Sequence, residues 1–504
     1  MLLIKFLQLP IKKPMNKETR IKKIQDIIDL NQDKPFGITE IPWKDKLESM
    51  KVYQIPLDYL VFNKYNGRIK SRTKSLEKQK RVIDEYSDEG KAIIEELLWK
   101  SKIERNEKTL KDIHDFGQQK VGIITKDGII IDGNRRAMLL NEITNKNFSK
   151  IKFTKKYDYF KAVVLPVNID ENRLEIKKLE TSFQMKEDEK LKYNPVEKYL
   201  DAKDIYEALT NKTFKPEEDF KEDTIETIAN WMGEAPSEIK KYLQTIAIMD
   251  EYLEYLEYDG VYTQLDNRED QFLNLSKWLN NFYGESSKRA SWGYKNEDVD
   301  DLKIIGFDYI RLRGKNNYDG KEFRNLADGN ADKHFFGDKN IWSSFSKKHY
   351  EILDSIPEES PIDFDSNNLE KHLNARDRSF FDESKLENEI SAFIENLNEH
   401  KYQLGYNQAA GAPEKLIKRA SQTFDAIKTN HSSFSKPEIQ KLVKELAEKI
   451  NGTIQEKSVT NSLSVVINTL NNLKVDNISK EKSEEVDKQL EFIRKICFDI
   501  KKKL

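Results

Sequence analysis

Residues 119–143, QKVGIITKDGIIIDGNRRAMLLNEI, are the part of this chain that most restricts its fold. Val121–Thr125 is rich in β-branched residues and predicts a strand. Lys126-Asp127-Gly128 is a hairpin signal, and Ile129–Ile131 predicts the return strand. Arg135–Ile143 has apolar residues at helical spacing, so the whole segment predicts two strands followed by a helix.

The turn into this helix, Asp132-Gly133-Asn134, has the residues of a phosphate-binding site. A helix N-terminus presents unpaired backbone N–H groups and the positive end of the helix dipole. Gly133 allows the backbone to approach a ligand closely, and Arg135 and Arg136 add charge-assisted hydrogen-bond donors. The sequence also allows a simpler interpretation, in which the turn is only a tight connection and the arginines are solvated.

The 119–143 segment resembles the second signature of the ParB/sulfiredoxin superfamily, in which a Gly-x-Arg-Arg turn grips the phosphates of a nucleotide. Residues 55–69 resemble the first signature, and three of them stand in its Asn-Pro-x-x-x-Arg pattern: Asn63, Asn66 and Arg68. Residues 179–200 resemble the third signature, and Asn194-Pro195-Val196-Glu197 matches its second half. The three segments follow one another in the family order, so residues 52–200 as a whole resemble the family.

The resemblance implies a fold class, a ligand and a set of site residues. The implied fold is an α+β ParB/sulfiredoxin-like domain at the N-terminus, followed by a mostly α-helical region. The implied ligand is CTP or ATP with Mg²⁺, and its binding biases a conformational switch. Glu180 is the acidic residue left for Mg²⁺ and for catalysis, because Mg²⁺ prefers carboxylate and phosphate oxygens. The implied nucleotide-binding residues are Arg68, Asp132, Gly133, Asn134, Arg135, Arg136, Thr181 and Gln184.

Two positions depart from the family pattern. Asn134 stands where ParB proteins carry Glu and sulfiredoxins carry their catalytic Cys. Sulfiredoxin chemistry needs that thiol as a nucleophile and is therefore excluded. The site also lacks one of the carboxylates that ParB proteins have, which argues against hydrolysis of a bound nucleotide. Glu180 is one residue too far from Gln184, so that Thr181 and Ser182 occupy the Glu-Asn places of the third signature.

Residues 225–244, IETIANWMGEAPSEIKKYLQ, have the spacing of a helix-turn-helix. A small Ala229 permits a close helix crossing, Gly233 makes the turn, and Ile239 anchors the second helix. The recognition helix would be residues 236–246, with lysines on phosphates and Ser or Gln on base edges. Its DNA-binding candidates are Ser237, Lys240, Lys241 and Gln244. The alternative is a helical hairpin that only packs.

Three other segments are rich in basic residues and are candidate nucleic-acid surfaces. Residues 64–81 contain eight lysines and arginines, and residues 5–23 form a basic N-terminal arm. Residues 307–326 interleave aromatic residues with arginine and lysine. Each segment also has an ordinary structural interpretation. Residues 64–81 would be a solvated face, residues 5–23 a tail, and residues 307–326 part of a domain core.

The composition limits the class of protein. The 504 residues contain 86 Lys and Arg against 88 Asp and Glu, and this net charge of −2 excludes a uniformly basic protein of the histone type. A hydrophobic share of 37% is enough for ordinary cores. A single cysteine, Cys497, excludes a disulfide framework and favours a cytoplasmic location. No apolar run reaches the roughly 18 residues of a membrane helix, so we expect no membrane partner.

The sequence predicts five parts and several elements within them. The parts are an N-terminal leader (1–48), the ParB-like domain (49–190), a helix-turn-helix domain (191–260), a mixed domain of unknown type (261–380) and a C-terminal helical domain (381–504). The expected elements outside the 119–143 segment are a helix over 15–32, a loop over 33–50, strands over 52–62 and 160–167, and a helix over 89–103. Residues 384–504 indicate amphipathic helices, for which a homodimer, a partner-binding bundle and intramolecular packing all stay open.

Three functions follow from these observations. The leading hypothesis is a ParB-like, nucleotide-dependent DNA-binding protein, and ParB-like chains with large extra domains often look like mobile-element or phage-defence components. The second is a ParB-like nuclease, or an enzyme that hydrolyses a nucleotide or transfers its phosphate. Asp158, Glu175 and Lys177 have the loose outline of a metal-dependent nuclease site. The third is an interaction scaffold with a degenerate pocket.

Overall fold

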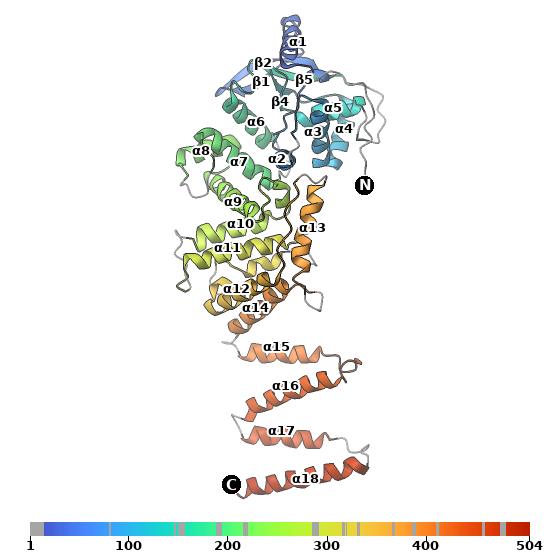
Figure 1. The fold of residues 1–504 in the computed structure, drawn as a ribbon, viewed down its shortest axis with the longest axis vertical. Coiled ribbons are helices and arrows are strands. Elements are labelled where there is room, and N and C mark those ends of the chain that lie inside the picture. Colours follow the sequence, from blue (N-terminus) through green and yellow to red (C-terminus); the bar gives the residue numbers. More distant parts are fainter. Residues whose placement is uncertain are drawn as a thin grey trace. The chain divides into compact units, whose positions relative to one another are not determined.

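The computed structural model of the chain divides into two compact units, Met1–Gln408 and Ala409–Leu504 (Figure 1). The described residues are 15–79, 82–145, 148–149, 157–187, 194–214, 220–284, 292–314, 318, 320–329, 333–364, 368–385, 390–409, 413–455, 459–473 and 480–504. The first unit combines a five-stranded sheet with helices, and the second is helical in its described residues. The expected fold class is therefore confirmed at the level of an α+β N-terminal part and a mostly helical remainder.

The sheet has the strand order β1–β2–β5–β3–β4. Its strands are β1 (Gly37–Trp43), β2 (Lys46–Pro56), β3 (Gly122–Thr125), β4 (Ile130–Asp132) and β5 (Tyr159–Leu165). β3 and β5 are parallel and the other neighbours are antiparallel, so the sheet is mixed. The predicted hairpin of the 119–143 segment is the β3–β4 pair, and the predicted strand over 160–167 is β5.

The expected loop over residues 33–50 is wrong, because this segment forms the β1–β2 hairpin. Lys44 and Asp45 make its two-residue turn, and both have left-handed backbone angles, with φ of 51° and 62°. Such turns usually contain Asn or Gly, so the sequence carries no hairpin signal here. The predicted strand over 52–62 is right only as far as Pro56, where β2 ends.

Helices cover both faces of the sheet. The first face is covered by α1 (Lys17–Leu30), α3 (Asp88–Ser101), α4 (Ile103–Phe116) and α5 (Asn134–Asn145), and the second by α6 (Arg173–Glu187). Strand β5 shows the alternation that this layering requires: Phe160 and Ala162 join the first core, whereas Val163 and Leu165 join the second. The predicted helices over 15–32, 89–103 and 135–143 are confirmed as α1, α3 and α5.

Helix α2 (Lys70–Lys78) departs from the sheet and packs against the helical part of the first unit. Its neighbours are α7 (Pro195–Thr210) and the short 3₁₀ helix η3 (Tyr262–Leu265). The residues that it buries are polar: Lys70, Ser71, Thr73 and Ser75. Because buried polar groups need partners, α2 depends on hydrogen bonds and ion pairs from these neighbours.

The helical part of the first unit has one continuous apolar core, which runs from Val196 to Leu404. Its helices after α7 are α8 (Glu222–Met232), α9 (Pro236–Tyr255), α10 (Glu269–Lys277), α11 (Asn296–Arg311), α12 (Lys339–Ser355), α13 (Leu369–Asp382) and α14 (Ala392–Ala409). This core crosses both sequence-derived borders at 260/261 and 380/381, and the second border lies inside α13. Residues 261–380 are mainly helical where they are described.

The second unit contains the helices α15 (Pro413–Asp425), α16 (Pro437–Gln455), α17 (Val459–Asn471) and α18 (Lys480–Lys501). They confirm the amphipathic helices expected in this region. None of the side chains described in 413–504 is buried. Within the described parts of both units, no helix combines the length and the apolar character needed to cross a membrane.

Candidate functional site

Three segments that are far apart in the sequence meet at the start of α5. The backbone N–H of Asn63, in the loop after β2, donates to Oδ1 of Asn134, the first residue of α5, at 3.0 Å. The side-chain amide of Asn63 donates to Oε1 of Glu180 on α6, at 3.2 Å. All three side chains are buried. The structure therefore joins one residue from each of the three segments that carry the ParB resemblance.

Gly133 is the last residue before α5, and it takes a left-handed backbone conformation with a φ of 109°. Its carbonyl accepts the N–H of Ala137 at 2.9 Å, which starts the hydrogen-bond ladder of the helix. A Cβ atom added at Gly133 would lie 2.6 Å from the ring of Phe160. The turn thus requires glycine, and it leaves the first N–H groups of α5 without intrahelical partners.

The two arginines of this turn have different surroundings. Arg135 is buried, with 8% of its surface exposed. Arg136 is half-buried and forms an ion pair with Asp132, four residues earlier. Asp132 therefore orients the guanidinium of Arg136 and offsets its charge, and a phosphate bound here would share that guanidinium.

Arg68 lies in the same loop as Asn63. Asn66 shapes this loop, because its backbone N–H donates to the carbonyl of Asn63 at 3.1 Å. Its side-chain Oδ1 accepts the N–H of Arg68 at 3.3 Å. Asn63 and Asn66 are buried and Arg68 is half-buried, so the loop carries a partly accessible arginine beside the site.

Helix α6 contributes an ion pair and a buried hydroxyl to the site. Lys177 places its ammonium 3.7 Å from Oε2 of Glu180. Thr181 is buried, and its hydroxyl has no hydrogen-bond partner within the described ranges of the chain. A buried hydroxyl without a partner costs about 1–3 kcal/mol, so Thr181 is a candidate contact for a ligand. The side chain of Gln184 lies outside the described residues.

The carboxylate predicted to hold a metal at this site is that of Glu180. Among the residues that the structure describes, no group of three or more His, Cys, Asp and Glu side chains gathers to hold a metal ion. Glu180 fits Mg²⁺ in the way that Mg²⁺ often binds, through one carboxylate with phosphates and water as the other ligands. Of the residues in the nuclease outline, Asp158 directly precedes β5, whereas Glu175 and Lys177 lie on α6.

A buried ion-pair cluster beside the site has no signal in the sequence. Lys70 is 0% exposed, and its ammonium pairs with the carboxylates of Asp201 and of Asp204, the latter at 2.9 Å. Lys177 joins this cluster, 3.1 Å from Asp201. Burial alone would lower the pKa of Lys70, but the two carboxylates outweigh it and raise that pKa well above its ordinary value.

The site and the cluster form one continuous line of polar contacts, which we call the polar chain. It links Asn134, Asn63, Glu180, Lys177 and Asp201 through hydrogen bonds and ion pairs of 3.0 to 3.7 Å. These residues belong to α5, the loop after β2, α6 and α7. The polar chain therefore connects the start of α5 with the ion pairs of α7.

Glu197 connects the third signature-like segment to α2. Its carboxylate accepts the backbone N–H of Ser71 at 3.1 Å and the hydroxyl of Ser71 at 2.6 Å. Asn194 caps its own helix by accepting the N–H of Val196 at 3.0 Å. Burial raises the pKa of Glu197 to about 7, against the opposing effect of the hydrogen bonds from Ser71. Asn194 and Glu197 thus serve as caps for two different helices.

Helices α8 and α9 form a helical hairpin at the position of the predicted helix-turn-helix. Gly233 is left-handed, with a φ of 70°, and Ala229 and Ile239 are buried. The second helix is longer than expected, because α9 continues from 246 to Tyr255. These residues therefore take the structural roles that their spacing predicts.

Both lysines among the DNA-binding candidates of this hairpin are paired with carboxylates. Lys240 lies 2.6 Å from Glu222, and Lys241 lies 3.2 Å from Glu238. Of the other two DNA-binding candidates, Ser237 is exposed and Gln244 is half-buried. Paired lysines attract phosphates less than unpaired ones, so the hairpin is a weak phosphate-binding surface as it stands.

The basic stretch 64–81 is largely neutralised within the protein. Its ion pairs are Lys64–Glu77 at 3.0 Å, Arg72–Asp266 at 3.3 Å and Lys74–Asp204 at 3.2 Å. Lys80 and Arg81 lie outside the described residues, as do residues 5–14 of the basic arm. The stretch therefore attaches α2 to the helical part, rather than forming a solvated face.

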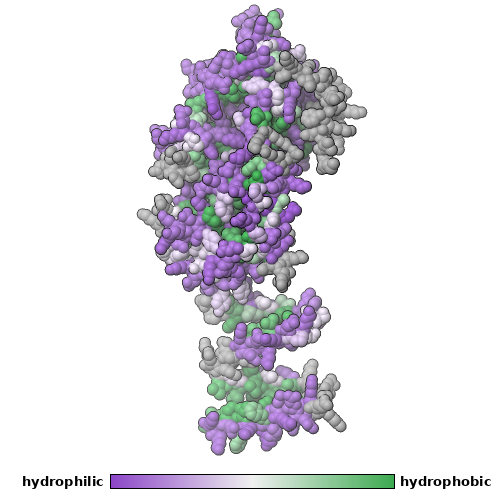
Figure 2. Space-filling model, viewed as in Figure 1, coloured by the Kyte–Doolittle hydropathy of each residue, from purple (hydrophilic) through white to green (hydrophobic). Residues whose placement is uncertain are grey.

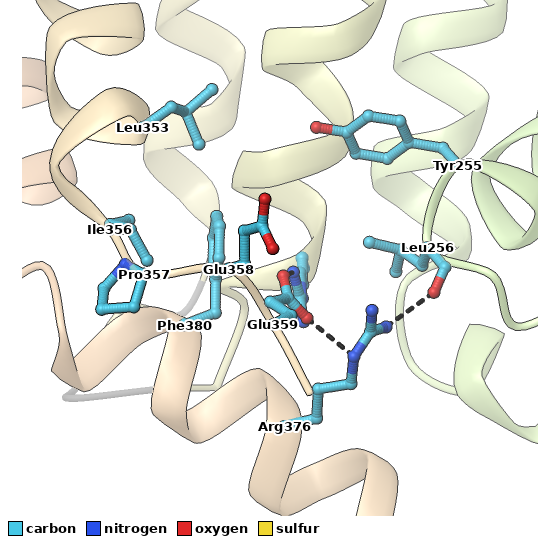
Figure 3. A pocket seen from close by; sticks show the side chains of 10 residues that line it. Tyr255, Leu256, Leu353, Ile356, Pro357, Glu358, Glu359, Arg376 and Phe380 are labelled. Atoms are coloured by element: carbon cyan, nitrogen blue, oxygen red, sulfur yellow. Dashed lines mark hydrogen bonds and ion pairs between the residues drawn. The ribbon is translucent and has the colours of Figure 1, made fainter. Parts of the chain in front are cut away.

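A hollow of about 270 Å³ lies between α9, α13 and the segment that follows α12 (Figure 3). Two arginines line it, and both bind Glu359. Arg376 places Nε 2.8 Å from this carboxylate and donates to the carbonyl of Leu256 at 2.7 Å. Arg311 pairs with the same carboxylate and stacks 4.3 Å from the ring of Phe380. Neither guanidinium is left for an anionic ligand, so this arrangement is structural.

The interpretation of residues 307–326 as a domain core is confirmed. Phe307 and Tyr309 are fully buried, and Arg311 is bound by Glu359 and Asp377. Aromatic rings that are enclosed in this way are not accessible for stacking on nucleic acid.

Comparisons with protein-family models, with curated proteins and with solved structures gave no match for this chain. The site at the start of α5 is therefore the basis on which a function can be assigned. Its elements are the Gly133 turn, the two arginines, and the polar chain that leads to α7.

We expect Gly133→Ala to lower the free energy of unfolding by about 2 kcal/mol, because the new Cβ overlaps the ring of Phe160 in a packed core. Urea unfolding measures this loss. Gly233→Ala is the matched control, since its φ is also positive but nothing lies within 4 Å of the added Cβ. It should cost only the backbone strain, about 1 kcal/mol. Equal losses in the two variants would show that Phe160 does not constrain the turn.

Proposed function

We propose that this chain is a ParB-like protein that binds a nucleotide at the Gly133 turn and uses it to control contact with DNA. The observation that carries this proposal is the convergence of Asn63, Asn134 and Glu180 at the N-terminus of α5. A tight connection alone would not need a buried polar cluster from three separate segments. A left-handed glycine, a helix N-terminus and two arginines at the same place support phosphate binding.

Each residue of the site has a role in this proposal. The N–H groups of the first turn of α5 and the guanidinium groups of Arg135 and Arg136 bind the phosphates. Arg68 and Thr181 are the other proposed ligand contacts, Thr181 because its buried hydroxyl needs a partner. Asn134 is an amide and cannot act as a general base, which favours binding over hydrolysis.

The ligand class is a nucleoside triphosphate, CTP or ATP, with Mg²⁺, which when bound neutralises part of the phosphate charge. Glu180 would hold the ion with its carboxylate. Lys177, which now lies between Glu180 and Asp201, would then pair with Asp201 alone. The polar chain thereby couples the ligand at α5 to the attachment of α7.

The DNA part of the proposal concerns the α8–α9 hairpin, which packs against α7. If the ion pairs of α7 change, α7 would shift against the α8–α9 hairpin, with which it is in direct contact. DNA binding requires Lys240 and Lys241 to exchange Glu222 and Glu238 for phosphates. Under this proposal DNA binding lies at this face, and because it must compete with these two ion pairs we expect it to be weak and to fall steeply with salt.

A thermal-shift panel of CTP, ATP, GTP and UTP with Mg²⁺ tests the nucleotide site. At about 100 times its dissociation constant, the correct nucleotide should stabilise the folded chain by about 2.7 kcal/mol. Arg135→Ala and Arg136→Ala should lose this shift relative to their own baselines. Arg105→Ala, on the exposed side of α4, is the control and should keep it.

Two outcomes would contradict the proposal: no shift with any nucleotide, or a shift that both site variants retain. The first outcome would favour a scaffold with a degenerate pocket. Release of phosphate, or nicking of DNA with Mg²⁺, that Glu180→Ala abolishes would favour the enzyme hypothesis instead.

A further inference from the structure

The second unit exposes an unusually large apolar surface. Of the large apolar side chains that are exposed in the described residues, 17 of 31 lie in 413–504. Figure 2 shows hydrophobic residues gathered over the four helices of this unit. Soluble monomers rarely leave contiguous apolar patches of this kind uncovered, so the surface indicates an interaction site.

Five apolar residues of α18, and Leu504 just beyond its end, follow the heptad spacing of a coiled coil, whereas Phe492, Ile496 and Phe498 lie outside this spacing. Alternating steps of four and three residues connect Val486, Leu490, Ile493, Cys497, Ile500 and Leu504. We call this set the α18 seam. A repeat of 3.5 residues keeps the seam on one side of the helix, and from Val486 to Ile500 it runs about 21 Å along α18. A seam of this form is complementary to a second helix with the same repeat.

The charges of α18 differ between its two halves. Residues 480–491 carry five acidic and three basic side chains, whereas residues 492–504 carry one acidic and five basic side chains. A parallel copy of the helix would place like halves side by side. An antiparallel copy places the acidic half of each helix beside the basic half of the other, which is attractive at both ends. The helix is thus complementary to itself in reversed orientation.

We propose that the α18 seam binds the α18 seam of a second copy of this chain in antiparallel orientation, which makes residues 409–504 a dimerisation unit. A two-fold axis relates the copies, so the same surface serves on both sides. Helices α15–α17 expose apolar residues of their own, which enlarge the interface toward the roughly 800 Å² per partner of stable complexes. This proposal rests on the second unit and does not depend on the nucleotide site.

Sedimentation analysis of the full chain over a concentration series tests the dimer. We expect a mass of twice the 59.3 kDa of one chain, falling to one chain on dilution. Leu490→Lys with Ile493→Lys puts charges in the seam and should raise the dissociation constant at least about 100-fold. Phe498→Lys is the control, because Phe498 is exposed outside the seam, and it should leave the constant unchanged. A wild-type monomer at every concentration, or a dimer that the seam variant retains, would overturn the proposal.

Charge reversal tests the orientation with variants that leave the seam intact. Glu485→Lys with Asp487→Lys makes the acidic half basic, and in an antiparallel pair it should raise the dissociation constant about tenfold. Adding Arg494→Glu and Lys501→Glu brings the other half from four net positive charges to none, which removes the repulsion and should lower the dissociation constant of the double variant again by at least about threefold. Reversal of Lys488 and Lys495 to Glu, on the face opposite the seam, should have no effect. Failure of the fourfold variant to restore the dimer would overturn the antiparallel arrangement.

Discussion

Lys70→Met is expected to lower the free energy of unfolding by about 3–5 kcal/mol, which is the usual cost of removing one partner from a buried ion pair. Lys70 is 0% exposed, and its ammonium compensates both Asp201 and Asp204. Without it, two carboxylates lie close together beside α2, while Lys177 still pairs with Asp201 and Lys74 with Asp204. Urea unfolding of the full chain, followed by tryptophan fluorescence, measures the loss.

A second substitution separates the ion pair from simple packing. Lys70→Met with Asp201→Asn removes one of the two uncompensated charges and should recover at least about 1 kcal/mol of the loss. Lys100→Met is the control, since its pair with Glu96 lies on the surface and should contribute less than about 1 kcal/mol. A loss for Lys70→Met that is no larger than this control would mean that the cluster does not hold α2.

Glu197 is expected to make the stability of the protein depend on pH. Its folded-state pKa is raised by burial from 4.5 to about 7, so the folded chain holds this proton more tightly than the unfolded chain. The contribution of Glu197 is therefore fully present below pH 4.5 and is lost as the pH rises through about 7. The difference in pKa corresponds to about 3 kcal/mol.

Glu197→Gln tests this sign directly, because the amide does not titrate. Unfolding at pH 5 and at pH 8 should show the variant gaining stability relative to wild type by about 3 kcal/mol between the two conditions. Glu226→Gln, at an exposed position on α8, should shift by less than about 0.5 kcal/mol. If wild type and Glu197→Gln lose stability in parallel, burial does not raise this pKa.

Local patterns predict much of the fold around the candidate site. The β-branched runs of β3 and β4, the Gly128 turn and the helix after Gly133 follow from residues that are neighbours in the sequence. The β1–β2 hairpin could not be predicted in this way, since its Lys44-Asp45 turn has left-handed angles without Asn or Gly. Helix positions were predictable in the second unit for the same reason, through the apolar spacing.

The ion-pair cluster shows why the rest of the site is not predictable from one sequence. Lys70 and Asp201 are separated by 131 positions, and neither stands in a pattern that differs from an ordinary solvated charge. The lysines of 64–81 therefore indicate a basic surface, although most of their described members pair with carboxylates of other elements. Glu197 is a similar case: the match to Asn-Pro-x-Glu predicts its presence, but not the helix that it caps.

The cap that Glu197 places on α2 has a consequence for the order of synthesis. Ser71 leaves the ribosome 126 residues before its partner, Glu197. At about 5–20 residues per second, this delay is on the order of 10 s. During that time the sheet can form, but the N–H groups of α2 and the ammonium of Lys70 have only water as a partner. Helix α2 therefore docks late, with α7, although it is encoded early.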